Sequence, residues 1–121
     1  MRIAAATIAV IAALTAPALA APYPVAGKWG QSGSTEKGAI DCARLRVIDF
    51  RGERRFDSGG GVPDYRAIAV NPQGTAQWRI TDEFRTGQIN GRTSYTLRQI
   101  DTDRIELQMQ PGGTIKLRRC R

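Results

Sequence analysis

The chain has 121 residues, of which 24% are charged and 41% hydrophobic, and its formal net charge is +7. This length fits one domain and leaves no room for a second of similar size. The sequence contains no histidine, which excludes Ser-His and Cys-His catalysis.

The first twenty residues predict a cleaved signal peptide. Arg2 supplies a positive start, Ile3 to Leu14 is an uncharged apolar run, and Ala18-Leu19-Ala20 places small residues where signal peptidase cuts. A membrane anchor is the alternative, but a spanning helix needs about 20 apolar residues and this run is shorter. We therefore expect cleavage after Ala20 and a periplasmic or secreted protein, with residues 21–121 as one domain without a transmembrane segment.

The expected exported part of the chain is basic. Removal of Arg2 leaves 17 Lys and Arg against 11 Asp and Glu, a formal charge of +6. Basic proteins attract polyanions, and an exported protein meets acidic envelope polymers and lipid head groups rather than nucleic acid. The alternative is that the charge serves solubility alone, because the arginines are spread along the sequence and form no single block.

Alternation of apolar and polar residues predicts strands in the first half of this region. We expect a first strand at 25–32 with Trp29 as its anchor. A second is expected at 40–50, where apolar residues occur on both parities and suggest a bulge. Gly59-Gly60-Gly61 marks a loop at 58–63.

The middle of the chain predicts a hairpin followed by an ambiguous stretch. Strands are expected at 65–70 and 75–81, joined by a turn at 71–74, with Trp78 and Ile80 facing inward. Residues 84–92 are ambiguous because Gly87 and Gly91 interrupt the pattern.

The C-terminal third has the clearest alternation of the whole sequence. Three runs each have one apolar face, and short connections rich in Asp or Gly separate them, which predicts a three-stranded antiparallel meander. The expected inward residues are Tyr95, Leu97 and Gln99, then Ile105, Leu107 and Met109, then Ile115 and Leu117.

Seven or eight short strands without crossover helices predict an all-β fold. An antiparallel meander removes its exposed edges most simply by closing on itself, so we expect an up-and-down barrel. A β-sandwich is the alternative.

The two cysteines, Cys42 and Cys120, are expected to form one disulfide, since an even number of cysteines in an oxidising compartment favours a bridge. This bridge would tie the last strand to an early one. A metal site is the alternative, but two cysteines without any histidine cannot supply the four usual zinc ligands.

Gly27-Lys28-Trp29 on the first strand, the meander and the terminal Arg118-Arg119-Cys120-Arg121 together resemble the calycin pattern, whose members include lipocalins and small bacterial metalloprotease inhibitors. The resemblance implies that Gly27 lets the chain bend, that Trp29 closes the barrel end and that Arg119 packs on the indole as a cation–π pair. The Lys-Leu-Arg-Arg-Cys ending is also similar to that of other small exported proteobacterial proteins.

No residues predict catalysis or a cofactor site. Asp82 and Glu83 are neighbours in sequence, and because neighbours on a strand point to opposite faces, their carboxylates are not expected to converge. Asp101 and Asp103 lie in an expected turn, where aspartate commonly binds its own backbone. We therefore expect a protein that is not an enzyme and has no metal site.

Two binding roles follow. The barrel is expected either to hold an apolar small molecule or to present its basic surface to an anionic envelope polymer. In the first case aromatic side chains would line the ligand site. The alternative is that these side chains only fill the barrel interior. The candidate lining residues, besides Trp29, are Tyr65, Trp78, Phe84 and Tyr95.

A third hypothesis is a periplasmic protease inhibitor. After cleavage the chain would begin Ala21-Pro22-Tyr23-Pro24, and two prolines in four residues favour an extended segment that could enter a protease cleft. An ordinary N-terminus is the alternative.

Overall fold

The computed structural model describes residues 21–121. The predicted signal peptide and its cleavage site lie outside the described residues. Within 21–121, no helix has the length and apolar character that crossing a membrane requires.

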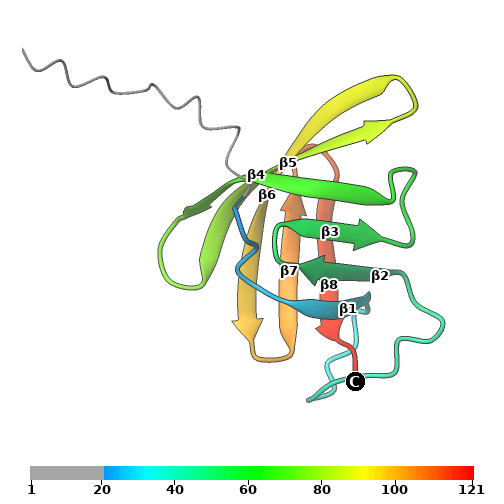
Figure 1. The fold of residues 1–121 in the computed structure, drawn as a ribbon. Coiled ribbons are helices and arrows are strands. Elements are labelled where there is room, and N and C mark those ends of the chain that lie inside the picture. The colour runs from blue at the N-terminus through cyan, green and yellow to red at the C-terminus, as the bar shows by residue number, and fades with distance from the viewer. Residues whose placement is uncertain (1–20) are drawn as a thin grey trace, which may run out of the picture.

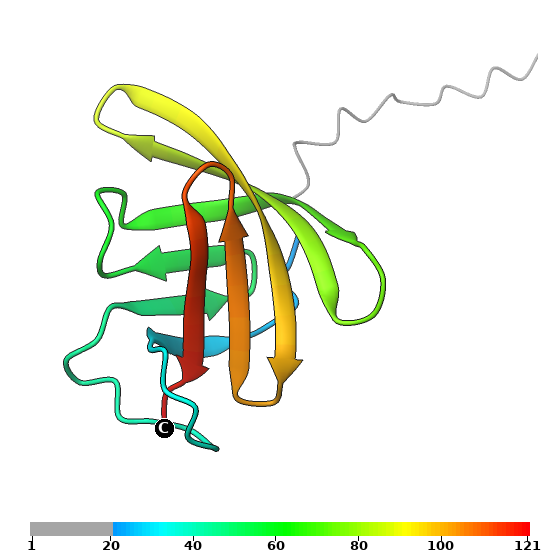
Figure 2. The same ribbon diagram turned by 180° about the vertical axis from the view of Figure 1, so that it is seen from behind.

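Eight antiparallel strands form a closed barrel in which each strand pairs with its neighbours in sequence and β1 pairs with β8 (Figures 1 and 2). The predicted all-β meander is thus confirmed, closed as a barrel and not stacked as a sandwich. The strands are β1 (Gly27–Gln31), β2 (Val47–Arg51), β3 (Arg54–Asp57), β4 (Asp64–Pro72), β5 (Gln77–Thr86), β6 (Ile89–Asp101), β7 (Arg104–Met109) and β8 (Gly113–Arg119).

Alternate residues of the strands fill the barrel, as period-two geometry requires. Trp29 is fully buried and pairs across the closing seam with Arg119. Five of the expected inward residues of the C-terminal strands are almost completely buried. The buried hydrophobic residues of the strands are Trp29, Ile48, Phe50, Ala67, Ile80, Tyr95, Leu97, Ile105, Leu107 and Leu117.

Two strand predictions in the first half differ from the structure. The strand expected at 40–50 begins only at Val47, because a turn precedes it in which Leu45 N–H donates to the Cys42 carbonyl (3.1 Å). Strand β3 was not predicted. Its inward residues are Arg55 and Asp57, which are charged, so the sequence shows no apolar alternation there.

The ambiguous stretch at 84–92 is the tip of a long hairpin. Strand β5 runs to Thr86, β6 starts at Ile89, and Gly87 turns the chain with a positive φ of 58°. Figure 2 shows this hairpin projecting past the neighbouring strands.

Cys42 and Cys120 form the predicted disulfide, with Cα atoms 5.6 Å apart and a sequence separation of 78. The expectation that it joins two strands is wrong, because Cys42 lies in the loop between β1 and β2. This loop approaches β1 so closely that a side chain at Gly30 would overlap Cys42 Sγ.

Arg118 also binds the β1–β2 loop, through hydrogen bonds to its backbone. Its side chain is buried on the outer face of β8, where the guanidinium donates to the carbonyls of Ser34 (2.9 Å) and Gly38 (2.6 Å). The loop therefore covers the outer face of β8 at Arg118, whereas Lys116 on the same face stays exposed.

Candidate functional site

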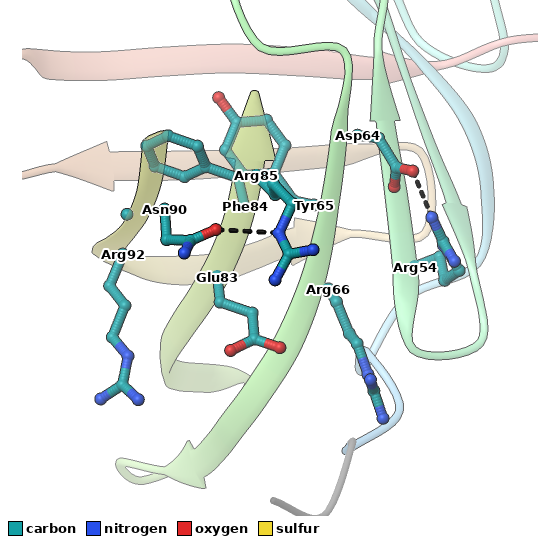
Figure 3. Close-up of a pocket in the computed structure, with 10 residues that line it drawn as sticks. Arg54, Asp64, Tyr65, Arg66, Glu83, Phe84, Arg85, Asn90 and Arg92 are labelled. Carbon is teal, nitrogen blue, oxygen red and sulfur yellow. Dashed lines mark hydrogen bonds and ion pairs between the residues drawn. The ribbon is translucent and has the colours of Figure 1, made fainter. Parts of the chain in front are cut away.

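A pocket of about 750 Å³ lies between the β5–β6 hairpin and the adjoining parts of β3 and β4 (Figure 3). We call it the hairpin pocket. Its volume falls within the range of small-molecule sites, which is roughly 300 to 1,000 Å³. It is lined by Arg54, Asp64, Tyr65, Arg66, Glu83, Phe84, Arg85, Asn90, Gly91 and Arg92.

The strand register places four of these side chains in one row across the sheet. Arg54 on β3 is opposite Arg66 on β4, Arg66 is opposite Glu83 on β5, and Glu83 is opposite Arg92 on β6. Directly opposite like charges destabilise a sheet, so the Arg54–Arg66 pair carries a cost in folding stability. The row brings together arginines that are far apart in sequence.

The arginines of the hairpin pocket are only partly neutralised. Arg54 pairs with Asp64, and Arg66 Nε lies 3.8 Å from a Glu53 oxygen. Arg85 Nε donates to the uncharged Asn90 amide oxygen (2.9 Å).

Within the described part of the chain, neither Arg85 nor Arg92 makes an ion pair, and both are exposed. Four arginines stand against two carboxylates in the lining, so the pocket carries a surplus of positive charge.

Two aromatic rings supply the apolar part of the pocket. Tyr65 and Phe84 meet edge to face with ring centroids 5.6 Å apart. The Phe84 ring lies over Gly91, its cross-strand partner, and a Cβ at Gly91 would overlap that ring. Glycine at this position therefore lets the ring approach the β6 backbone closely.

A buried polar cluster lies next to the aromatic part, with Asp82 at its centre. Asp82 is fully buried and accepts hydrogen bonds from the hydroxyls of Tyr23 (2.7 Å) and Tyr95 (2.8 Å). Arg55 Nε donates to the same carboxylate at 2.9 Å, and the Arg55 side chain is 3% exposed. The charge of Asp82 is thus balanced inside the barrel.

A second carboxylate extends the cluster. Asp57 lies 3.7 Å from Arg55 and accepts two hydrogen bonds from Arg46, at 2.9 and 2.6 Å. The Arg55 guanidinium carbon lies 3.8 Å from the centre of the Tyr65 ring. Since Tyr65 also lines the hairpin pocket, the buried cluster supports one wall of that pocket.

Burial and charge shift the pKa values of the cluster. Burial, reinforced by the Asp82 charge, raises the pKa of both Tyr23 and Tyr95, so both hydroxyls remain protonated donors. Burial alone would raise the pKa of Asp57, but hydrogen bonds from Arg46 and from the Gly59 N–H outweigh it and lower that pKa. Burial disfavours the Arg55 charge, yet the surrounding acidic groups outweigh burial and raise its pKa.

The segment Ala21-Pro22-Tyr23-Pro24 is bound to the barrel. Ala21 N–H donates to the Ala67 carbonyl (3.2 Å), Tyr23 N–H donates to the Gly52 carbonyl (2.8 Å), and the Tyr23 ring packs against Phe50. To enter a protease cleft, the segment would have to give up the Tyr23–Asp82 hydrogen bond.

The residues predicted for the barrel end lie together on β1 and β8. Gly27 is the first residue of β1 and has a φ of 87°, a conformation that favours glycine. The Arg119 guanidinium carbon lies 4.7 Å from the Trp29 ring centre, and Arg119 also pairs with Asp103 (3.3 Å).

Of the four other aromatic residues predicted to line a ligand, only Tyr65 and Phe84 border the hairpin pocket. Tyr95 is fully buried beside Asp82. Trp78 is partly buried against the hydrophobic core and is not among the residues that line the pocket. The alternation of residues predicts which face of the sheet a side chain lies on, but not its position along the barrel axis. It could therefore not distinguish the residues that border the pocket from those buried in the barrel.

Sequence reasoning missed Asp82 and the arginine row. Asp82 lies two residues after Ile80 and four after Trp78, so the same alternation places it on the inward face. This spacing was the available signal for a buried carboxylate. The row had no such signal, because it depends on the register between β3, β4, β5 and β6.

Among residues 21–121, no group of three or more Cys, Asp or Glu side chains is placed to hold a metal ion. Comparison of the chain with protein-family models, with curated proteins and with solved structures found no match. The calycin relationship and the exported location therefore stay predictions.

Proposed function

We propose that this protein is a binding module that holds an anionic ligand with an apolar or planar portion in the hairpin pocket. The observation that carries the proposal is the pairing of a cationic lining with the Tyr65–Phe84 aromatic pair in one pocket. Guanidinium groups bind carboxylate, phosphate and sulfate oxygens, whereas aromatic rings favour contact with an apolar or planar group. A ligand that combines the two chemistries would use both parts of the pocket.

The filled barrel interior supports the choice of this pocket over the barrel centre. Large side chains such as Trp29, Phe50 and Tyr95 are almost completely buried there, and Asp82 and Arg55 occupy the remaining polar part. An apolar ligand at the centre would have to displace this packing, whereas the hairpin pocket is already open. The anchored N-terminal segment gives no support to the inhibitor hypothesis.

The test is a comparison of two fluorescent probes that share a ring system. One is 1-anilinonaphthalene-8-sulfonate, and the other is the uncharged N-phenyl-1-naphthylamine. We expect the purified protein to bind the sulfonate more tightly, because only the sulfonate engages the arginines. Binding of the sulfonate should weaken at about 0.5 M NaCl, where the screening length falls to roughly 4 Å.

The double variant Arg85→Gln/Arg92→Gln should lower the affinity for the sulfonate probe by about tenfold or more, since it removes two exposed cations that make no ion pair with any acidic side chain of residues 21–121. The matched control is Arg44→Gln/Arg121→Gln. It changes the net charge equally, but neither residue lines the pocket. Equal losses in both double variants would mean that only overall charge attracts the probe, and would refute the proposed site.

A further inference from the structure

The tip of the β5–β6 hairpin exposes a large apolar side chain. Among residues 21–121, the exposed large hydrophobic side chains are Ile89, at 64%, and Ile100, at 39%. Ile89 pairs with Thr86 across the two-residue turn that joins β5 and β6. Figure 1 shows this hairpin extending away from the barrel. An isoleucine that is 64% exposed contributes little to the packing of the barrel.

The hairpin is amphipathic, with its two faces fixed by the pairing of β5 and β6. Phe84 and Ile89 have the same parity relative to the turn and share one face, whereas Arg85 and Arg92 share the other. The apolar face thus continues from the aromatic part of the hairpin pocket to the tip, and the cationic face borders the same pocket.

This arrangement matches the boundary between water and an anionic lipid surface. Apolar side chains insert among acyl chains there, while arginines stay at the level of the phosphates. Residues 21–121 also carry the formal charge of +6, which complements such a surface. A dissolved anion would account for the arginines of the pocket but would leave Ile89 without a partner.

We propose that the hairpin docks on a phospholipid surface, with Ile89 in the acyl boundary and an anionic phosphate head group at the arginines of the hairpin pocket. This inference rests on the proposed function, since it names the ligand of the same pocket. The lipid phosphate supplies the anion, and the adjoining acyl chain supplies the apolar portion that contacts Phe84.

Vesicle sedimentation tests the inference. The wild-type protein should bind vesicles of about 30 mol% phosphatidylglycerol in phosphatidylcholine, and should bind pure phosphatidylcholine vesicles at least tenfold more weakly. Ile89→Gln should lower the partition coefficient on the anionic vesicles about tenfold and leave affinity for the soluble sulfonate probe unchanged. Arg85→Gln/Arg92→Gln should weaken binding to both vesicles and probe.

Ile100→Gln is the matched control, because it makes the same exchange at the opposite end of β6. It should bind vesicles as the wild type does. Failure of the wild type to bind anionic vesicles, or normal vesicle binding by Ile89→Gln, would overturn the lipid inference. The proposed function stands in both of these cases if the Arg85→Gln/Arg92→Gln variant still binds the sulfonate probe more weakly than the wild type. If that variant binds the probe normally, both proposals fail.

Discussion

Replacement of Asp82 with asparagine should lower the free energy of unfolding by about 3 to 5 kcal/mol, the range expected when one partner of a buried ion pair is removed. Asparagine has nearly the same side-chain volume as aspartate, so the loss of stability would come from the removed charge and not from a cavity. It leaves the buried Arg55 guanidinium with Asp57 as its remaining carboxylate, at 3.7 Å instead of 2.9 Å.

The position of Asp82 explains why the effect should be so large. The carboxylate is fully buried and is contacted by three donors from three parts of the chain, namely Tyr23 before β1, Arg55 on β3 and Tyr95 on β6. Removal of the charge weakens all three contacts together. It should also disturb the hairpin pocket, because Arg55 packs on the Tyr65 ring.

Urea unfolding followed by tryptophan fluorescence measures this loss. Glu83→Gln is the matched control, since it removes a carboxylate from the next residue, which is half-buried on the opposite face. It should change stability by less than about 0.5 kcal/mol. The paired variant Asp82→Leu/Arg55→Met should lose less than the sum of its single variants, because it leaves no uncompensated charge. A loss for Asp82→Asn no larger than that for Glu83→Gln would show that the cluster does not stabilise the barrel.

Loss of the disulfide is the second large effect. The variant Cys42→Ser/Cys120→Ser should lose about 4 to 5 kcal/mol, since the bridge closes a loop with a sequence separation of 78 and limits the freedom of the unfolded chain. It also joins the long β1–β2 loop to the end of β8, where the barrel closes. Without the disulfide, the loop would be held mainly by the Arg118 hydrogen bonds and by the backbone β-bridge between Ile40 and Cys120.

The midpoint of urea unfolding with and without a reducing agent checks this prediction. The wild type should lose stability on reduction, whereas the double serine variant should not respond to the reducing agent at all. Sulfonate-probe affinity should be nearly unchanged in the double variant wherever it remains folded, because neither cysteine lines the hairpin pocket. Equal midpoints for the oxidised wild type and the variant would contradict the entropic argument.

The sequence was sufficient to predict the architecture because most strands show one apolar face. The alternation at 95–99, 105–109 and 115–117 fixed the C-terminal meander, and β6, β7 and β8 contain it. An even cysteine count, together with the expectation of an oxidising compartment, was sufficient to predict the disulfide.

Strand β3 could not be predicted, because its interior residues are charged. Arg55 and Asp57 are buried only because Asp82 and Arg46 compensate them, and those partners come from β5 and the β1–β2 loop. A rule that places apolar residues inward misses a strand whose inward residues form ion pairs. The same reasoning applies to Asp82, which was treated only as a catalytic candidate.

The candidate site was harder to predict than the fold, since it depends on register and on the height of each residue in the barrel. Arg54, Arg66 and Arg92 appear in the sequence as scattered charges, and the pairing of four strands places them in one row. Tyr65 and Phe84 were among the predicted lining residues, and both border the hairpin pocket. Only the structure shows that Trp78 and Tyr95, in contrast, do not line this pocket.

The most direct test of the proposed function is a titration of ¹⁵N-labelled protein with 1-anilinonaphthalene-8-sulfonate, followed by amide chemical shifts. We predict saturable shifts concentrated at 64–66, 83–86 and 89–92, the strand segments around the hairpin pocket, with little change near Trp29 and Arg119. Shifts centred on the Trp29 end, or small shifts spread over arginines on all faces without saturation, would contradict a binding site in the hairpin pocket.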